Sequence, residues 1–243
     1  MRLDGKTALI TGGGTGVGQA TARLFAEEGG QVVIVGRREQ PLQATCQSCT
    51  GPKPVEYRVA DVGNRAQALA VAEEVTGRFG RIDILVNNAG VNVRKRLLAE
   101  LSPEDWDHVM NVNATGAFNL VHAVLPQMRA RRDGVIISIS SIAGCRPSVL
   151  GGAAYSASKH AMSALTKVIG LEELENGIRA TVISPGEIDT PILEDRPVKV
   201  SDAHRARILQ ADDVAVAALF VATLPPRANV PELIIKPTTQ AYA

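Results

Sequence analysis

The chain has 243 residues, of which 45% are hydrophobic, so it is long enough to bury a sizeable core within one α/β domain. Its 26 basic and 25 acidic side chains leave a formal net charge of +1, which provides no overall field for nucleic acid or an anionic membrane. No apolar run approaches the ~18 residues that span a bilayer, and no signal peptide precedes the first strand, so we expect a cytoplasmic protein that binds neither nucleic acid nor membranes.

The first predicted element is an apolar, β-branched strand at residues 7–11, and a glycine-rich loop follows it directly. This loop, from Thr11 to Gly18, reads T-G-x-x-x-G-x-G and leads into a helical pattern over residues 18–28. Glycines let the backbone approach a pyrophosphate closely, and a helix start offers free N–H groups and the positive end of the helix dipole. We therefore predict a phosphate-binding loop. The alternative is a flexible turn, because the strict G-x-G-x-x-G motif is absent.

The second predicted strand, at residues 31–35, ends in Gly36-Arg37-Arg38. A dinucleotide-binding fold selective for NAD carries a carboxylate here, about twenty residues past the glycine loop, to bind the ribose 2′-hydroxyl. The guanidinium groups that stand there instead are suited to the 2′-phosphate of NADP. The sequence thus favours NADP(H) over NAD(H). The alternative is that both arginines belong to a solvated helix start.

The remaining elements continue the alternation of strand and helix. Further strands are expected at residues 55–59, 82–86, 134–140, 178–184 and 232–236, and helices at 38–46, 65–79, 105–132, 155–175 and 212–224. This order predicts an α/β fold with a doubly wound parallel sheet of about seven strands and helices on both faces, the Rossmann arrangement. Because ligands bind at the carboxyl ends of such strands, we expect the motifs that follow them to line one crevice.

Cys46 and Cys49 form a C-x-x-C pair, and Cys145 lies far from both in sequence. A zinc site needs four ligands, and neither a second close pair nor suitably spaced histidines accompany these cysteines. No metal is expected. The pair ends a helical pattern instead of beginning a helix after a strand, which fits an incidental surface pair better than a redox motif.

Tyr155 and Lys159 stand four residues apart in the helix expected at 155–175, so their side chains share one face. A phenol titrates near ~10, and proton transfer close to neutral pH needs a shift of its pKa by ~3 units. A neighbouring ammonium favours the phenolate, and an oxidised nicotinamide adds to this effect. The pair therefore predicts a general acid and base. The alternative is an ordinary i, i+4 pair on a solvated helix.

Together these motifs resemble the short-chain dehydrogenase/reductase family, in its compact single-domain form. The resemblance extends from Thr7 to about Thr190 and adds four motifs at ordinary spacing: Asn87-Asn88-Ala89-Gly90, Asn113, Ser141 and Pro185-Gly186. It implies a single dinucleotide-binding and catalytic domain over residues 1–243, with a substrate lid at about 188–210. It also implies a homodimer or homotetramer, which the surplus of apolar positions in the helices at 105–132 and 155–175 supports.

The resemblance further implies an oxidoreductase that interconverts a carbonyl and a secondary or primary alcohol of a small molecule by hydride transfer. Tyr155 would be the general acid and base, Lys159 would lower its pKa and hold the nicotinamide ribose, and Ser141 would orient the substrate oxygen. Asn113 would anchor a water molecule that links Lys159 to solvent. The residues implied to hold the cofactor are Gly12, Gly14, Thr15, Gly16, Val17, Gly18, Arg37, Arg38, Asp61, Val62, Asn88, Ala89, Gly90, Tyr155, Lys159, Pro185, Gly186, Ile188 and Thr190.

Two basic sites flank the mouth of the expected crevice. Arg94, Lys95 and Arg96 follow the Asn-Asn-Ala-Gly motif, and Arg146 follows the fifth strand. We hypothesise that one of these side chains, Arg146 first and Arg94 next, pairs with the carboxylate of a hydroxy or keto acid. The alternative is that they are ordinary solvated arginines. The ending PELIIKPTTQAYA is similar to that of a branch with 3-hydroxy acid dehydrogenases and some aldehyde reductases.

Two functions other than redox catalysis are alternatives. A non-catalytic, NADP(H)-binding regulatory protein has the same fold, but loss of the tyrosine or the lysine would mark it, and both are present here. An epimerase or dehydratase of the extended branch has a longer chain with a further substrate domain and a different glycine spacing. The sequence therefore favours the oxidoreductase.

Overall fold

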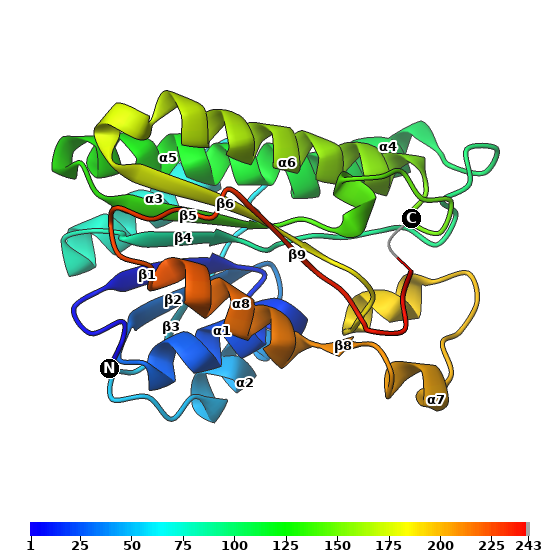
Figure 1. Ribbon diagram of the computed structural model, residues 1–243, viewed down its shortest axis with the longest axis horizontal. Coiled ribbons are helices and arrows are strands. Elements are labelled where there is room, and N and C mark those ends of the chain that lie inside the picture. The colour runs from blue at the N-terminus through cyan, green and yellow to red at the C-terminus, as the bar shows by residue number, and fades with distance from the viewer. Residues whose placement is uncertain (242–243) are drawn as a thin grey trace.

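A parallel sheet of seven strands forms the centre of the computed structural model, which describes residues 1–241 (Figure 1). The strand order is β3-β2-β1-β4-β5-β6-β9, and every neighbouring pair runs parallel. Helices cover both faces, so the predicted Rossmann-type fold is confirmed. The strands are β1 Thr7–Thr11, β2 Gln31–Gly36, β3 Glu56–Val59, β4 Ile84–Asn87, β5 Gly134–Ile139, β6 Ile178–Pro185 and β9 Glu232–Ile235.

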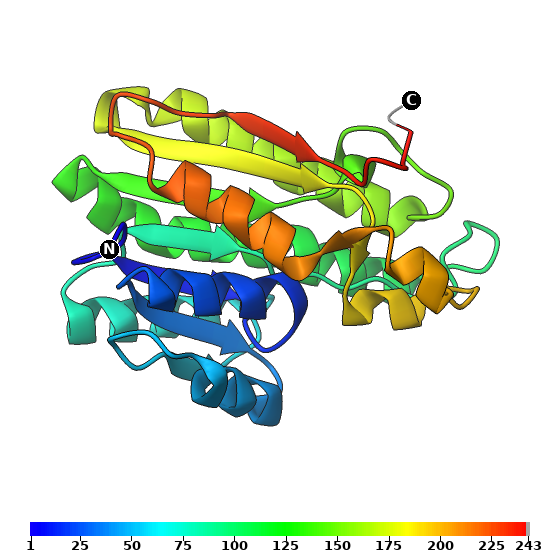
Figure 2. The ribbon, with the colours of Figure 1, turned by 60° about the horizontal axis from the view of Figure 1, so that its bottom comes forward.

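The helices form two layers, one on each side of the sheet (Figures 1 and 2). One layer consists of α1 (Gly16–Glu27), α2 (Glu39–Ser48) and α8 (Ala211–Ala222). The other consists of α3 (Arg65–Phe79), α4 (Pro103–Met110), α5 (Gly116–Arg131) and α6 (Ala153–Glu172). Within residues 1–241, none of the helices is long and apolar enough to cross a membrane.

Each central strand contributes to two apolar cores, because successive side chains point to opposite faces. In β1, Ile10 packs with Phe25 of α1, whereas Leu9 belongs to the cluster that contains Leu120 of α5. All four side chains are fully buried. This double burial explains why the strands read as continuous apolar runs in the sequence.

The strand order reverses between β1 and β4, which are neighbours in the sheet although β2 and β3 separate them in the chain. In doubly wound sheets such a switch point opens a crevice at the carboxyl ends of the strands. The glycine loop after β1 and the Asn-Asn-Ala-Gly motif after β4 therefore lie side by side at this crevice. The topology brings together the motifs that the sequence separates.

The helix expected over residues 105–132 is interrupted. A π-helical turn at Asn111–Thr115 separates α4 from α5. Single π-turns add one residue to a helix and are found mostly at functional sites. Asn113 lies within this turn and is buried, and its side-chain amide reaches Val91 after β4. Apolar periodicity alone does not reveal such a local insertion, because the pattern continues on both sides of it.

Residues 188–210 form an excursion beyond the carboxyl edge of the sheet (Figure 1). Two short strands, β7 (Ile188–Asp189) and β8 (Leu209–Gln210), pair at its base, and a 3₁₀ turn at Pro191–Asp195 and helix α7 (Asp202–Arg205) lie between them. Arg205 closes the excursion by an ion pair of 2.8 Å to Asp189. This segment of the chain has a defined structure and is not an open loop.

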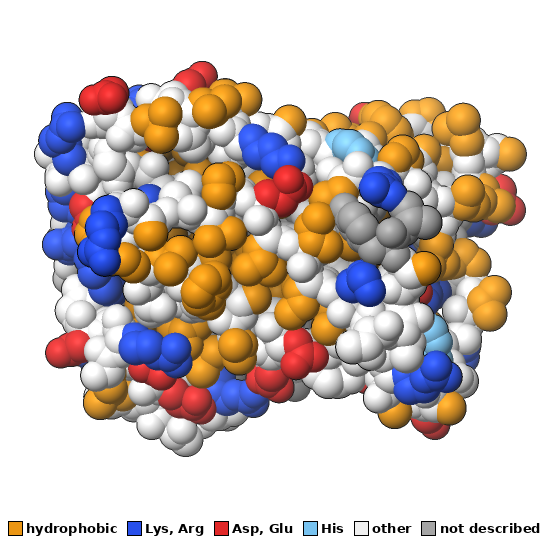
Figure 3. Space-filling model, viewed as in Figure 1, with side chains coloured by type: hydrophobic (Ala, Val, Ile, Leu, Met, Phe, Trp, Pro, Cys, Tyr) orange, Lys and Arg blue, Asp and Glu red, His pale blue; other side chains and the backbone are white. Residues whose placement is uncertain are grey.

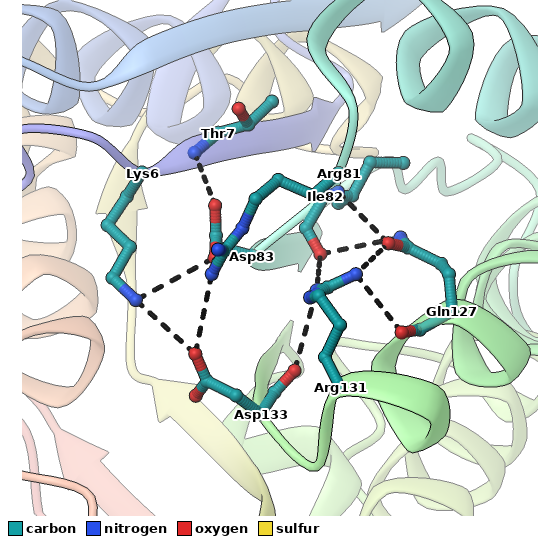
Figure 4. A network of polar contacts seen from close by, with 8 residues as sticks. All are labelled: Lys6, Thr7, Arg81, Ile82, Asp83, Gln127, Arg131 and Asp133. Atoms are coloured by element: carbon teal, nitrogen blue, oxygen red, sulfur yellow. Dashed lines mark hydrogen bonds and ion pairs between the residues drawn. The ribbon is translucent and has the colours of Figure 1, made fainter.

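At the opposite, amino-terminal edge of the sheet, a network of charged side chains joins the beginnings of three strands (Figure 4). Asp83 is buried. It accepts a 2.8 Å hydrogen bond from the backbone N–H of Thr7 and forms an ion pair with Arg81. Lys6 and Arg81 also pair with Asp133 beside β5, at 3.3 and 3.5 Å. This network fixes the start of β4 against its neighbours β1 and β5.

Candidate active site

The glycine loop has the geometry of a phosphate cradle. Gly12 and Gly16 adopt positive φ angles of 65° and 56°, which favour glycine. A Cβ atom on Gly18 would lie 2.3 Å from the carbonyl oxygen of Gly12, so a side chain would fill this space. Thr15 is the N-cap residue of α1 but makes no side-chain capping hydrogen bond. The helix start therefore keeps N–H groups for a ligand, and the loop fits a pyrophosphate.

The loop after β4 is fixed directly against the glycine loop. The hydroxyl oxygen of Thr11 accepts hydrogen bonds of 2.9 Å from the backbone N–H groups of Asn88 and Ala89. The side-chain amide of Asn88 donates in turn to the carbonyl oxygen of Thr11 at 2.9 Å. These contacts place the motifs predicted to bind the cofactor at one edge, and they explain why threonine and asparagine occupy these positions.

The residues expected around the adenosine lie at the ends of β2 and β3. Asp61 and Val62 follow β3, and a carboxylate oxygen of Asp61 accepts a 2.9 Å hydrogen bond from Gly63 N–H. Arg37 and Arg38 follow β2, and both are exposed. Arg38 is the N-cap residue of α2, so both residues lie where β2 leads into this helix.

Tyr155 and Lys159 lie on α6 with Ser141 beside them. The Lys159 ammonium is buried, donates a 2.8 Å hydrogen bond to the carbonyl oxygen of Ile139, and lies 5.7 Å from the centre of the Tyr155 ring. The Ser141 side chain is hydrogen-bonded to the phenol. Three elements thus converge here: the end of β5, the turn that follows it, and the first turns of α6.

The pKa of Tyr155 is raised above its ordinary value, because burial disfavours the phenolate. The hydrogen bond from Ser141 and the positive charge of Arg96 both act in the lowering direction. Burial also lowers the pKa of Lys159, to about 8. The sequence predicted a phenol made acidic by its lysine neighbour, whereas in the protein alone desolvation dominates and the groups that lower the pKa of the phenol are Ser141 and Arg96.

Ser140 and Ser141 are turned to different partners. The hydroxyl of Ser140 is buried and interacts with the Lys159 carbonyl oxygen at 3.1 Å and with the Ser163 hydroxyl at 2.8 Å. The hydroxyl of Ser141 accepts a 3.1 Å hydrogen bond from Ala143 N–H and reaches Tyr155. The choice between these serines by spacing therefore agrees with the geometry.

Asn113 connects α6 to the loop after β4. Its side-chain oxygen accepts from Val91 N–H at 2.8 Å, and its side-chain nitrogen donates at 3.0 Å both to the Val91 carbonyl and to the Ser158 hydroxyl. A Cβ atom on Gly90 would lie 3.3 Å from the Lys159 ammonium and 3.6 Å from the Asn113 oxygen. Gly90, Lys159 and Asn113 thus surround one position at the crevice.

A cavity opens beside Tyr155, between the end of the sheet and the excursion at 188–210. Its polar wall includes Ser141 and Tyr155, and Ile192 and Leu193 of the excursion line its outer side. The complete lining is Asn92, Arg96, Ser140, Ser141, Ile142, Ala143, Ser148, Leu150, Gly151, Tyr155, Pro185, Gly186, Glu187, Ile188, Thr190, Ile192, Leu193, Arg196 and Gln240. The cavity thus combines hydrogen-bonding groups with apolar side chains, a composition typical of small-molecule sites.

The arginines that line the cavity are Arg96 and Arg196. Arg94 and Arg146, which the sequence suggested for a substrate carboxylate, are both exposed and lie outside the cavity lining. Arg96 belongs to the basic run noticed in the sequence, but nothing in the sequence shows which of three neighbouring cations turns inward. Arg196 comes from the excursion, in which the resemblance implied only Ile188 and Thr190 as site residues.

The cysteine pair lies apart from the cavity. Cys46 and Cys49 are free thiols and half-buried. Burial raises the pKa of Cys46 to about 11 and also raises the pKa of Cys49. Because the thiolate is the reactive form of cysteine, such values do not suit a redox pair.

Comparison with known proteins is in line with this geometry. The family model described as short chain dehydrogenase matches residues 6–200. The 3-oxoacyl-[acyl-carrier-protein] reductase of Thermotoga maritima is 38% identical over 229 residues, which cover 92% of this chain and 92% of that protein. Among solved structures, the closed form of a serine dehydrogenase complexed with NADP+ has a TM-score of 0.88 at 30% identity, covering 98% of this chain and 97% of that one. The 3-ketoacyl-(acyl-carrier-protein) reductase of Brucella melitensis, complexed with NADH, has a TM-score of 0.87 at 29% identity, covering 96% and 97%.

Proposed function

The chain belongs to the short-chain dehydrogenase/reductase family and is an oxidoreductase, and from this premise we propose that it uses NADP(H) to interconvert a carbonyl and a primary or secondary alcohol of a small molecule. The observation that carries the proposal is that Ser141 and Tyr155 line the cavity together and that the Lys159 ammonium lies behind them, 5.7 Å from the centre of the Tyr155 ring. A proton donor, a buried cation and a hydroxyl are the groups that reduction of a carbonyl requires.

The cofactor binds along the crevice at the carboxyl edge of the sheet. When bound, the nicotinamide supplies or accepts the hydride. The glycine loop, with Gly12, Gly16 and Gly18, holds the pyrophosphate, since its backbone leaves space there and the start of α1 is uncapped. Asp61 and Val62 lie on the adenine side. Lys159 lies on the ribose side, next to Gly90.

Arg37 and Arg38 select NADP(H). Both guanidinium groups are exposed at the end of β2, where a 2′-phosphate of the adenosine ribose would lie. Bidentate pairing with a phosphate is the interaction that arginine provides best. The similar solved structures include complexes with NADP+ and with NADH, so the choice of NADP(H) is argued from this chain's own residues.

In the reductive direction Tyr155 gives its phenolic proton to the carbonyl oxygen, while the carbonyl carbon gains a hydride with its two electrons. The products are the alcohol and the oxidised dinucleotide. Ser141 hydrogen-bonds the substrate oxygen and holds it near the phenol, and Lys159 favours the phenolate that remains. Asn113 holds the π-turn against Val91 and anchors a water molecule that links Lys159 to solvent. In the oxidative direction the same phenolate accepts the proton of the alcohol.

The excursion at residues 188–210 acts as the substrate lid of a single domain. Its residues Ile188, Thr190, Ile192, Leu193 and Arg196 line the cavity from the side that faces away from the sheet. Exclusion of water by such a segment strengthens the electrostatic interactions within a site. The lid therefore takes part in substrate selection.

A homodimer or homotetramer stays a prediction, and so does the cytoplasmic location. The assembly is supported by hydrophobic side chains on the surface shown in Figure 3, where they gather over α8 and β9. Val216 and Phe220 of α8 and Ile234 of β9 are 59%, 48% and 40% exposed. Such a patch on a face of the molecule marks a surface that another chain covers.

The proposal is tested by NADPH binding and NADPH oxidation against a panel of ketones, aldehydes and keto acids. Turnover of one class of carbonyl, with NADPH bound more tightly than NADH, is the expected result. Tight binding of NADPH without turnover of any substrate would contradict the enzymatic proposal and would leave a regulatory, NADP(H)-binding function in its place.

A further inference from the structure

Arg96 is a buried cation in the wall of the cavity. Its side chain is only 6% exposed, although it follows the exposed residues Arg94 and Lys95. Its guanidinium donates from Nε to the carbonyl oxygen of Val93 at 2.9 Å and from Nη1 to that of Leu150 at 3.1 Å. From Nη2 it donates to the carbonyl oxygen of Asp195 in the lid. Arg96 thus connects the loop after β4, the loop before α6, and the lid.

All three of these acceptors are neutral backbone carbonyls. Among residues 1–241, no carboxylate forms an ion pair with Arg96. Arg196, the other arginine of the cavity, differs because it pairs with Glu187 at 3.2 Å. Burial lowers the pKa of Arg96, and the nearby charge of Arg196 acts in the same direction, whereas the charges of Asp195 and Tyr155 act in the raising direction. The Asp195 carboxylate stays outside ion-pair distance, and a desolvated cation without a directly paired counter-ion is costly, so this position favours an anionic ligand.

The Arg96 guanidinium also shares a cavity with the groups proposed to react. Arg96, Ser141 and Tyr155 line the same cavity, and the charge of Arg96 acts on the pKa of the Tyr155 phenol. A guanidinium has five N–H donors, of which three are used by the carbonyls, so one on each Nη remains for a ligand. The wall between these polar groups is apolar and includes Ile142 and Leu150.

We propose that the substrate is a hydroxy or keto carboxylic acid whose carboxylate pairs with Arg96 while its hydroxyl or carbonyl oxygen meets Tyr155 and Ser141. The assignment rests on the proposed oxidoreductase function and names the substrate class for the same site. It replaces Arg146 and Arg94 as the partner of the carboxylate, because those side chains lie outside the cavity lining.

The test compares keto acids of increasing chain length with their methyl esters, which have the same carbonyl but no charge. Wild type is expected to reduce one keto acid with a kcat/KM at least 10-fold above that of its ester. A hydrogen-bonded charge of this kind contributes about 1.5–3 kcal/mol, so Arg96→Gln should lower kcat/KM for the acid about 10- to 100-fold and change the ester much less. Arg96→Lys, which keeps the charge, should recover part of the loss.

The control is Lys95→Ala, which removes a positive charge from the adjacent exposed position and should leave the ratio of acid to ester unchanged. Equal losses on acid and ester in Arg96→Gln would overturn the proposal, because they would show that the side chain only holds the loops and the lid together. If Arg96→Gln does not fold, the Arg96→Lys variant and the wild-type ratio of acid to ester decide the question.

Failure of this inference differs from failure of the proposed function. A wild type that reduces neutral ketones as well as keto acids is an oxidoreductase without the Arg96 site. A wild type that reduces no carbonyl contradicts the oxidoreductase, and calorimetry with NADP+ and an unreactive carboxylate, compared with its amide, then still tests Arg96. Equal affinity for carboxylate and amide would overturn the assignment.

Discussion

At the scale of single residues, the site depends on how burial and charge act on a few ionisable groups. The Tyr155 phenol is desolvated, which raises its pKa, and the buried Lys159 ammonium has its pKa lowered to about 8. Both shifts favour the neutral forms of the side chains. A positively charged nicotinamide next to them would shift the phenol toward the phenolate, so cofactor binding and proton transfer are coupled.

Replacing Lys159 should change how stability depends on pH. Burial lowers the pKa of this lysine from 10.5 to about 8, so between these values the unfolded chain binds more protons here than the folded protein does. Wild-type stability therefore gains up to about 3 kcal/mol as pH rises through this window, and Lys159→Met should lack that gain. Urea unfolding of both proteins near pH 7.5 and near pH 10 measures the difference. Parallel pH profiles would contradict the assignment.

The sequence predicted which residues lie together around Tyr155, but it did not predict which arginines line the cavity. Tyr155, Lys159 and Ser141 follow from short local spacings, which a helix or a strand end converts directly into proximity. Arg96 does not, because whether a cation in a loop points inward depends on carbonyls from three distant segments. The inward turn of Arg96 is a property of tertiary structure.

At the scale of elements, α1 and its glycine loop have a strict steric requirement. A Cβ atom on Gly18 would meet the Gly12 carbonyl oxygen at 2.3 Å, whereas a Cβ atom on Gly77 in α3 meets nothing within 4 Å. Gly18 therefore allows two backbone segments to approach closely, whereas nothing in the packing around Gly77 requires a glycine.

Alanine substitution of these glycines should have opposite effects. Gly18→Ala forces the loop to move, and we expect it to lower the free energy of unfolding by about 1–3 kcal/mol and to weaken NADPH binding. Gly77→Ala should raise the free energy of unfolding by about 0.5–1 kcal/mol and leave NADPH binding unchanged, because alanine restricts the unfolded chain and favours the helix. Thermal unfolding with and without NADPH checks both. Stabilisation by Gly18→Ala would contradict the cradle.

The long strands and helices were predictable because their apolar patterns extend over many residues. The π-turn at Asn111–Thr115 was not, since one inserted residue leaves the periodicity on both sides intact. The two-residue strands β7 and β8 were not predictable either, because their pairing depends on a contact between chain segments twenty residues apart. Sequence patterns therefore predict short elements that depend on distant contacts less well than long ones.

At the scale of the whole molecule, the two edges of the sheet have different roles. The carboxyl edge holds the glycine loop, Tyr155 with its neighbours and the excursion at residues 188–210, whereas the amino edge holds the charged network around Asp83 (Figure 4). Parallel strands place all their carboxyl ends at one edge, so the fold keeps the cavity apart from the charged network that stabilises the opposite edge.

Removing the centre of that network should affect stability alone. Asp83→Ala leaves the buried N–H of Thr7 without its acceptor and removes one of the two carboxylates that pair with Arg81, so we expect a loss of about 1–3 kcal/mol in the free energy of unfolding. The kcat of carbonyl reduction should stay close to that of wild type. Asp4→Ala, which removes an exposed ion pair to Lys53, is the matched control and should cost under about 0.5 kcal/mol. A large fall in kcat with unchanged stability in Asp83→Ala would contradict this division.

The central claim is that the Tyr155 phenol gives its proton to the substrate oxygen beside a bound dinucleotide. Single-turnover oxidation of enzyme-bound NADPH by a carbonyl substrate, in wild type and in Tyr155→Phe, tests it most directly. Removal of a general acid should slow this step about 10²- to 10⁴-fold while NADPH affinity stays near that of wild type. A Tyr155→Phe variant that oxidises NADPH at the wild-type rate would contradict the account.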